Sequence, residues 1–278
     1  MIKDVLVNLA VGAKRDAAAQ YGAAVAAELE AHACAVAFAW EPVIPATVMG
    51  GMVSVDIIEA QRAENEKAAK AAAAAFDALA KRNGLSVETH VITSTAAGAA
   101  DTFGRMGRRF DLSIACQADP DVISPVEDMI IEAAMFQSGR PVIVVPYIHQ
   151  GGLKLDRVMV CWDGGRAAAR AVGDAMPLLA RAKAVDVVTV TGERGKWDSV
   201  PGVDMGHHLA RHRLKVDVKR ISPADNDVEA TLLSYAADIS ADMIVMGGYG
   251  HSRLREFILG GVTRSMLKSM TVPCLMSH

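Results

Sequence analysis

Short apolar runs alternate with segments of helical periodicity along the whole chain. In the C-terminal half, strands are expected at residues 157–161, 186–191, 216–221, 243–246 and 272–276. Helices are expected between them, at residues 166–181, 206–213, 228–239 and 262–269. Short, continuous apolar strands that alternate with helices are typical of a parallel sheet covered on both faces. Because crossovers between parallel strands are right-handed, the pattern predicts a doubly wound layer.

The same pattern occurs twice, which indicates a degenerate internal repeat. Residues 5–7 match residues 158–160 at an offset of 153, and residues 141–144 match residues 273–276 at an offset of 132. The first half therefore carries about 21 extra residues, which we place after Glu41 in a loop and a longer helix. The matches predict an α/β fold with two tandem doubly wound domains, each with a five-stranded parallel sheet flanked by helices.

The two domains are expected at residues 1–149 and 153–278, with the glycine-rich link 150–152 between them. The chain has 278 residues, of which 51% are hydrophobic and 22% charged, and its net charge is −3. This balance gives no sign of a nucleic-acid surface. The alanine-rich stretch at 68–75 is too short and too charged to span a membrane. The start of the chain lacks a signal-peptide pattern, and the four scattered cysteines indicate a reducing compartment, so a cytoplasmic location is expected.

Glycines gather where the strand at 243–246 ends and the helix at 262–269 begins. The segment contains Gly247, Gly248, Gly250, Gly260 and Gly261, followed by Val262 and Thr263. Glycine lets the backbone approach an anion, and a helix N-terminus offers N–H groups and a positive dipole end. The pattern predicts a phosphate cradle, with glycines that only form tight turns as the alternative. It is neither a P-loop nor a Rossmann fingerprint, because neither motif's residues are present.

A carboxylate follows the first strand of the same half. Asp163 stands before Gly164 and Gly165. Ligands of doubly wound sheets bind outside the carboxyl ends of the strands, so Asp163 and the Gly247 loop are expected on one rim. Asp163 is the only acid that we place near the phosphates. It could ligate Mg²⁺ or orient a water, although a single carboxylate is weak support for a hydrolase.

The spacing of Gly247, Gly250 and Gly260, with Val262 and Thr263 after them, resembles the nucleotide-binding signature of the universal stress protein family. Asp163-Gly164 and the last strand, which begins with a proline, fit the same family. The resemblance covers the whole chain as a tandem pair, but its specific motif lies only in the second half.

The resemblance implies an adenine-nucleotide site, with ATP or another adenine nucleotide as the cofactor, with or without Mg²⁺. By this match Asp163 and Val190 flank the ribose and adenine, while residues 247–250 and 260–263 hold the phosphates. The chain departs from the family at Gly261, where the family usually has Ser or Thr. The missing hydroxyl could weaken binding by roughly 1.5–3 kcal/mol.

The first half lacks this signature. Cys116 to Pro120 stand in the place of Met246 to Gly250, and Ala10 stands where the other half has Asp163. A proline and larger side chains crowd the cradle, so this half is expected to be a structural partner that binds no nucleotide.

The resemblance also implies a contact between the halves, because family members pair through their last strands. Residues 142–145 would then lie beside residues 272–276 in an intramolecular pseudo-dimer, and a further homodimer stays open. The expected partner is a small-molecule nucleotide, with no nucleic acid and no membrane.

No metal ligand or catalytic residue is assigned. His208 and His212 could face one metal ion, but solvated surface histidines are preferred because no acid or cysteine has a matching spacing. There is no Gly-x-Ser-x-Gly elbow, and no Cys–His pair is evident.

The favoured function is a nucleotide-binding stress protein with a regulatory or protective role. A nucleotide-free interaction module and a slow ATP hydrolase that uses Asp163 are the alternatives.

Overall fold

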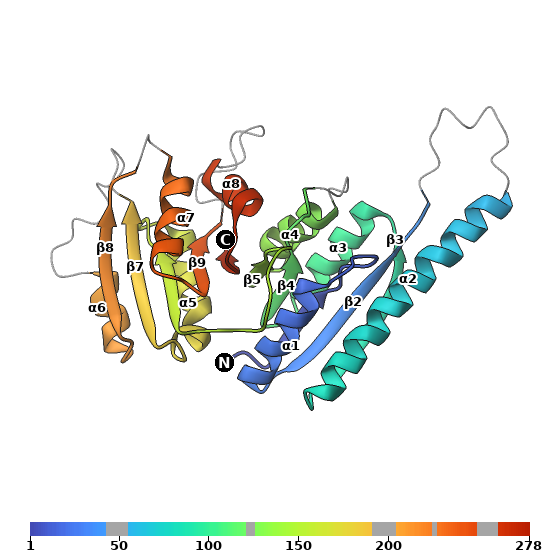
Figure 1. Ribbon diagram of the computed structural model, residues 1–278, viewed down its shortest axis with the longest axis horizontal. Helices are drawn as coiled ribbons and strands as arrows, with labels where there is room; N and C mark the ends of the chain where they lie inside the picture. The colour runs from blue at the N-terminus through green and yellow to red at the C-terminus, as the bar shows by residue number, and fades with distance from the viewer. Residues whose placement is uncertain (43–54, 121–125, 191–203, 224–226, 249–260) are drawn as a thin grey trace.

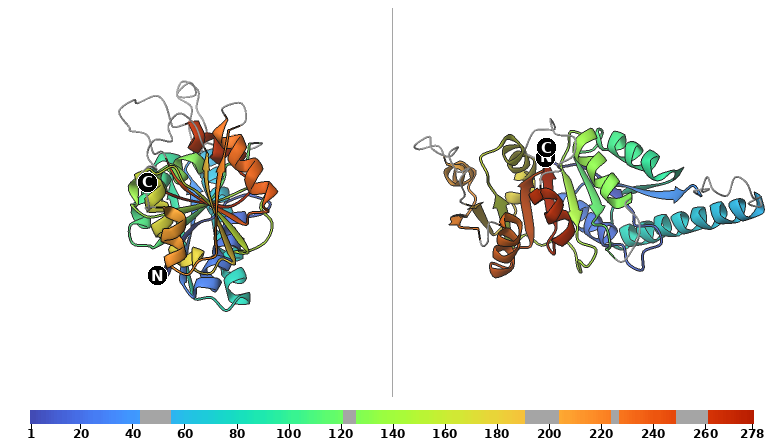
Figure 2. Two further views of the ribbon diagram at one scale, coloured as in Figure 1. Left: turned by 90° about the vertical axis from the view of Figure 1, so that its left-hand side faces the viewer. Right: turned by 90° about the horizontal axis from the view of Figure 1, so that it is seen from above.

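The chain folds into one continuous ten-stranded sheet with helices on both faces, as a computed structural model shows (Figures 1 and 2). The structure describes residues 1–42, 55–120, 126–190, 204–223, 227–248 and 261–278. The strand order is β3-β2-β1-β4-β5-β10-β9-β6-β7-β8, so the first five strands and the last five strands occupy opposite ends of the sheet.

Both halves have the same succession of strands and helices. The first half consists of β1 (Asp4–Asn8), α1 (Ala17–Leu29), β2 (His32–Trp40), α2 (Val55–Arg82), β3 (Val87–Ser94), α3 (Ala96–Gly107), β4 (Leu112–Cys116), α4 (Val126–Gln137) and β5 (Val142–Val145). The second half consists of β6 (Arg157–Cys161), α5 (Arg166–Leu179), β7 (Ala184–Val190), α6 (Met205–Arg211), β8 (Val216–Ile221), α7 (Val228–Asp238), β9 (Met243–Gly247), α8 (Gly261–Ser269) and β10 (Cys274–Ser277).

All neighbouring strands within each half are parallel, which confirms the expected fold class. Helices expected at 166–181, 206–213, 228–239 and 262–269 are present with ends that differ by one or two residues. The length difference between the halves appears in the helix after the second strand. In the first half this helix is α2, which has 28 residues. In the second half it is α6, which has seven, so the first half has the expected longer helix.

The two halves join through their last strands. β5 and β10 are antiparallel, with Ile143 opposite Leu275 and Val144 opposite Cys274. These four residues are fully buried. The pairing removes two apolar strand edges from solvent at once, and it converts two five-stranded sheets into one.

Two hydrophobic cores lie on opposite faces of the sheet. One face packs against α1, α2, α5 and α6, and the other packs against α3, α4, α7 and α8. Alternate residues of a strand point to opposite faces, and β2 illustrates the division. Ala33, Ala35 and Ala37 belong to the first core, whereas Cys34 and Val36 belong to the second.

Polar residues fix where several helices begin. Asp16, Thr95, Asp204 and Asp227 each accept a hydrogen bond from a backbone N–H in the first turn of the following helix. These side chains satisfy N–H groups that would otherwise lack a partner at a helix N-terminus.

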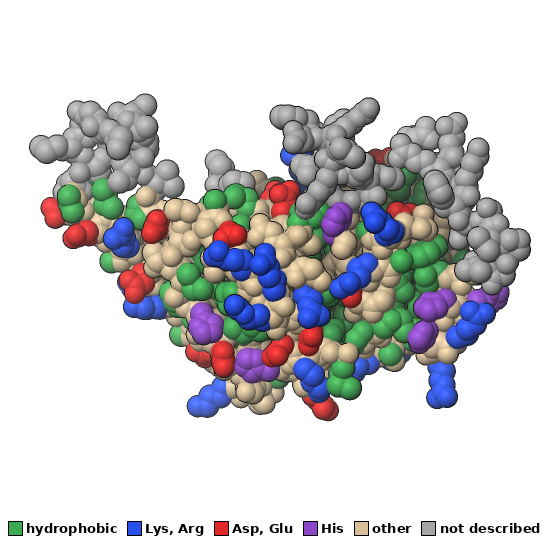
Figure 3. Space-filling view, turned by 180° about the vertical axis from the view of Figure 1, so that it is seen from behind, with side chains coloured by type: hydrophobic (Ala, Val, Ile, Leu, Met, Phe, Trp, Pro, Cys, Tyr) green, Lys and Arg blue, Asp and Glu red, His purple; other side chains and the backbone are tan. Residues whose placement is uncertain are grey.

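The outer surface is mixed in character. On the face that Figure 3 shows, basic and acidic side chains are interspersed with apolar ones. No helix within the described segments combines the length and apolar character that a membrane crossing requires. Cys34, Cys116 and Cys274 are buried free thiols, and Cys161 is partly buried.

Cleavage of the chain between the halves should leave them together. We expect the two fragments to co-elute after cleavage at a protease site inserted after Gly151, because separation would expose the buried edges of β5 and β10. Size-exclusion chromatography under native conditions measures this, with the uncleaved protein as control. Two separate monomer peaks would contradict the expectation.

Candidate functional site

The residues expected to bind a ligand gather at the carboxyl ends of three neighbouring strands. Asp163 follows β6, Val190 ends β7 and Gly247 ends β9. These strands are adjacent in the order β9-β6-β7 and parallel, so all three residues lie on one rim of the sheet. α8 follows β9 and begins with Gly261, Val262 and Thr263. Gly250 and Gly260 lie outside the described residues.

The rim contains the point at which the strand order switches. From β6 the chain crosses to β7 on one side, whereas β9 pairs with β6 on the other side. Helices that follow β6 and β9 therefore lie on opposite faces of the sheet. Ligands of doubly wound sheets bind at such a switch point, and Asp163 and Gly247 lie at the carboxyl ends of the two strands that meet there.

The Asp163 carboxylate lies at the start of α5. Its Oδ1 accepts a hydrogen bond from the backbone N–H of Gly165 at 2.7 Å, and Gly164 between them has a φ of 74°. Gly165 is the N-cap of α5 but has no side chain with which to cap it. The positive end of the α5 dipole therefore favours the negative charge of Asp163. Asp163 is exposed, so it is accessible to a ligand.

Gly247 has a structural explanation in addition to its place on the rim. A Cβ atom on this residue would lie 2.5 Å from the backbone N of Ala168 and 2.7 Å from the carbonyl carbon of Ala167. Glycine is required because the end of β9 packs directly against the first turn of α5. A Cβ atom on the neighbouring Gly248 would instead meet the end of the flexible Met135 side chain of α4, which can move aside.

Gly261, unlike Gly247, is exposed and does not pack against a neighbouring helix of the described residues. It has helical backbone at the first position of α8 and is exposed, and a Cβ atom on it would have no described atom within 4 Å. Thr263, two residues later, is only 5% exposed. The exposed backbone at Gly261 is therefore the most accessible part of this helix start within the described residues.

A residue of the first half holds the other end of α8. The Nε2 atom of Gln117 donates hydrogen bonds to the carbonyl oxygens of Leu267 at 2.8 Å and Lys268 at 3.0 Å. Both carbonyls belong to the last turn of α8, where backbone acceptors lack helical partners. Gln117 itself is only 3% exposed. Sequence reasoning missed this residue, although a glutamine directly after an apolar strand could have signalled a buried hydrogen bond.

The backbone register also corrects the match between the halves by one residue. The N–H of Gln117 donates to Val145 in the first half, and the N–H of Gly248 donates to Ser277 in the second half. Gln117 therefore corresponds to Gly248, whereas the alignment of Cys116 with Met246 placed it opposite Gly247. The offset of 131 between Asp111 and Asp242, which precede the two strands, gives the same correspondence as the structure.

The corresponding rim of the first half has a different arrangement. The Leu9 and Trp162 backbones make equivalent hydrogen bonds, which places Ala10 opposite Asp163 as expected. The Asp16 carboxylate accepts from the N–H of Ala10 at 2.7 Å and from the N–H of Ala19 at 2.8 Å. Burial raises the pKa of Asp16 above its ordinary value, although these N–H groups lower it. The Asp16 carboxylate thus caps α1, whereas α5 in the second half begins after Gly165 and has no capping side chain.

Two cavities among the described residues lie away from the rim of the second half. One of about 460 Å³ lies between α3 and α4, beside Ala100, Met129 and Phe136. Another of about 180 Å³ lies between α1 and the end of α5, beside Glu28 and Arg181. The rings of His208 and His212 have their centres 4.9 Å apart on the exposed face of α6, as the sequence spacing suggests.

Two doubly wound halves, joined through their last strands, define a tandem α/β fold with a parallel sheet in each half. Residues 154–278 match the model of the universal stress protein family. The family match thus covers the C-terminal half, and the full chain shares its fold with a solved universal stress protein.

Solved structures share the fold of the whole chain, and one protein is similar in sequence over a short segment. A crystal structure of a universal stress protein from Archaeoglobus fulgidus has a TM-score of 0.66 and 14% identity, covering 99% of this chain and 97% of that one. A structure of a functionally unknown protein from Pseudomonas aeruginosa has a TM-score of 0.60 and 14% identity, covering 99% and 92%. At the sequence level, a universal stress protein from Synechocystis sp. is 34% identical over 47 residues, which span 17% of this chain and 16% of that protein.

Substitution of two glycines of the motif by alanine should have opposite effects on the free energy of unfolding. Gly247→Ala is expected to destabilise the fold by about 1–3 kcal/mol, because its Cβ would meet the α5 backbone. Gly261→Ala should stabilise it by about 0.4–1 kcal/mol, because its Cβ meets no atom of the described residues within 4 Å and the unfolded chain loses freedom. Urea unfolding measures both changes, and effects of the same sign would contradict this account.

Loss of the Gln117 amide should weaken the attachment of α8. Gln117→Leu is expected to cost about 1–3 kcal/mol of unfolding free energy, since it leaves two carbonyl oxygens without their donor. Gln61→Leu on the exposed face of α2 is the matched control and should change stability by less than about 0.5 kcal/mol. Equal effects of the two substitutions in urea unfolding would show that Gln117 does not hold the helix.

Proposed function

We propose that this protein binds an adenine nucleotide at the rim of its C-terminal half, with a regulatory or protective role in the stress response. The observation that carries the proposal is the convergence of Asp163, Val190, Gly247 and the start of α8 at the switch point of the sheet. The same half matches the universal stress protein family. Mg²⁺ with the nucleotide and a cytoplasmic location are part of the proposal.

Each residue contributes a different chemistry to such a site. The Asp163 carboxylate is exposed and can accept hydrogen bonds from ribose hydroxyls. Val190, half-buried at the end of β7, offers an apolar contact for the adenine ring. The N–H groups at the start of α8 and its dipole favour phosphate. Gly250 and Gly260 stay sequence-based assignments for the phosphate loop.

The arrangement favours one site for each chain. In the first half, Asp16 already accepts the hydrogen bonds of Ala10 and Ala19 at the strand–helix junction. Because Ala10 stands where the second half has Asp163, this junction offers ribose hydroxyls no carboxylate in that place. We infer that the first half serves as a structural partner for the second.

The contacts of α8 suggest how nucleotide binding in the second half could change contacts with the first half. Its start lies at the proposed phosphate site, whereas its last turn is held by Gln117. His278, which follows β10, also contacts both halves, with a hydrogen bond to the Gly248 carbonyl at 3.0 Å and an edge-on contact with the Phe136 ring at 4.9 Å. A shift of α8 on nucleotide binding would therefore alter contacts across the β5–β10 junction.

A nucleotide-free interaction module is the second candidate. The close packing of Gly247 against α5 supports it, since packing alone accounts for that glycine. Native mass spectrometry of the purified protein separates the two candidates: retained ATP, ADP or AMP favours nucleotide binding. Phosphate release with Asp163→Asn as the comparison tests the slow hydrolase.

A side chain introduced at position 261 should change the affinity for a nucleotide. Gly261→Ser is expected to tighten ATP binding about fivefold, because its hydroxyl adds a charge-assisted hydrogen bond at the helix start and part of the gain is lost to ordering. Gly261→Ala is the matched control, since it fits the same helical backbone without a hydroxyl. Isothermal titration calorimetry measures affinity and stoichiometry in the intact chain, with one site expected. A stoichiometry near two, or equal affinities of the serine and alanine variants, would contradict the proposed site.

A further inference from the structure

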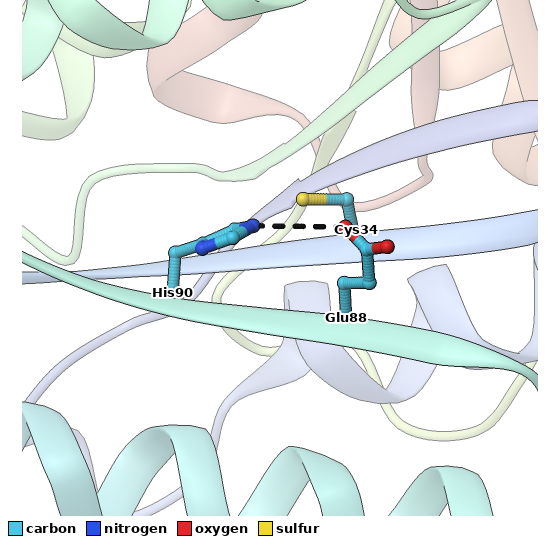
Figure 4. A group of neighbouring side chains, drawn as sticks. All are labelled: Cys34, Glu88 and His90. Atoms are coloured by element: carbon cyan, nitrogen blue, oxygen red, sulfur yellow. Dashed lines mark ion pairs between the residues drawn. The ribbon is translucent and has the colours of Figure 1, made fainter.

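Three side chains with metal-ligand chemistry meet at the outer end of the first half. Cys34 lies on β2, and Glu88 and His90 lie on the neighbouring edge strand β3. Cys34 pairs with Glu88 in the strand register, and Val36 pairs with His90. Because alternate residues share a face, all three side chains project from the same face of the sheet, as Figure 4 shows.

The ligand atoms of this triad are close together. The Cys34 sulfur, a Glu88 carboxylate oxygen and a His90 ring nitrogen all lie within 4.8 Å of one another. The His90 Nε2 and Glu88 Oε2 atoms are 3.8 Å apart. Tetrahedral coordination at zinc–ligand distances of 2.0–2.3 Å separates ligand atoms by roughly 3.5 Å. Small rotations of two exposed side chains would bring the atoms to that separation.

One ligand of the triad is buried, and the other two are exposed to solvent. Cys34 is only 2% exposed, whereas the side chains of His90 and Glu88 are 50% and 66% exposed. α2 packs on the opposite face of β2 and β3, where Ala33 and Ala35 belong to the other core. An ion from solvent can therefore reach the sulfur past the two exposed ligands.

The surrounding charges favour a cation. Asp4 lies on β1, opposite His32 on β2, and their side chains are 3.2 Å apart. The register places this pair on the same face as Cys34. Burial, together with the negative charges of Glu88 and Asp4, raises the pKa of the Cys34 thiol to about 11. A metal ion binds the thiolate, so metal binding would release the proton of the Cys34 thiol to solvent.

We propose that Cys34, Glu88 and His90 form a zinc site, with water as the fourth ligand. One sulfur, one imidazole nitrogen and one carboxylate oxygen suit Zn²⁺, whereas an all-oxygen set would suit Mg²⁺ or Ca²⁺. The site lies near the amino ends of β2 and β3, in the half that lacks the glycine motif. It is therefore independent of the proposed nucleotide site.

Titration of the metal-free, full-length protein with Co²⁺, a spectroscopic substitute for Zn²⁺, tests this proposal. We expect one Co²⁺ for each chain, a thiolate-to-cobalt charge-transfer band, and loss of the band when Zn²⁺ is added. Cys34→Ser should abolish the band. His90→Gln and Glu88→Gln, at exposed positions, should each weaken Co²⁺ binding at least about tenfold.

Two variants outside the triad serve as controls. Cys116→Ser changes another buried thiol, and His212→Gln removes one of the paired histidines on α6. Both should keep the band and the affinity, and unchanged melting temperatures without metal confirm that each variant is folded. The proposal is overturned if the parent protein shows no thiolate band, if the band persists in Cys34→Ser, or if His212→Gln weakens binding while His90→Gln does not.

Discussion

The antiparallel pairing of β5 with β10 is the interaction on which the rest of the molecule depends. Each half ends in a short, fully buried apolar strand, and alone it would leave an edge of unpaired backbone groups. Pairing the two edges satisfies both sets of hydrogen bonds and makes one sheet of ten strands. It also brings α4 and α8 to the same face near the junction, so that residues of one half can complete the other.

This junction gives the first half a structural role at the proposed site in the second. Gln117 caps the last turn of α8, and Met135 packs against Gly248 beside the end of β9. The helix whose start is proposed to meet phosphate is thus attached to the other half at its end. We therefore interpret the two halves as one functional unit, since a movement of α8 must change contacts on both sides of the junction.

The two halves differ at the rim where we propose that a ligand binds. At the same strand–helix junction, the first half has Asp16 as a helix cap, and the second has Gly165 with the exposed Asp163 before it. At the opposite, outer end of the sheet, the first half instead carries Cys34, Glu88 and His90 on one face. One architecture can hold different chemistry in its two copies because the buried strands fix the fold while rim and edge residues are less constrained.

The sequence by itself determined the strands, the helices, the repeat and the rim that carries Asp163 and Gly247. These features follow from local patterns, because buried parallel strands must be short apolar runs and their carboxyl ends must share one edge. Only the tertiary structure decided that Gly247 packs against α5, that Gln117 caps α8, and that Cys34 meets Glu88 and His90. Those facts depend on strand register and on contacts between distant residues, and a glycine needed for close helix packing looks the same in sequence as one that admits a phosphate.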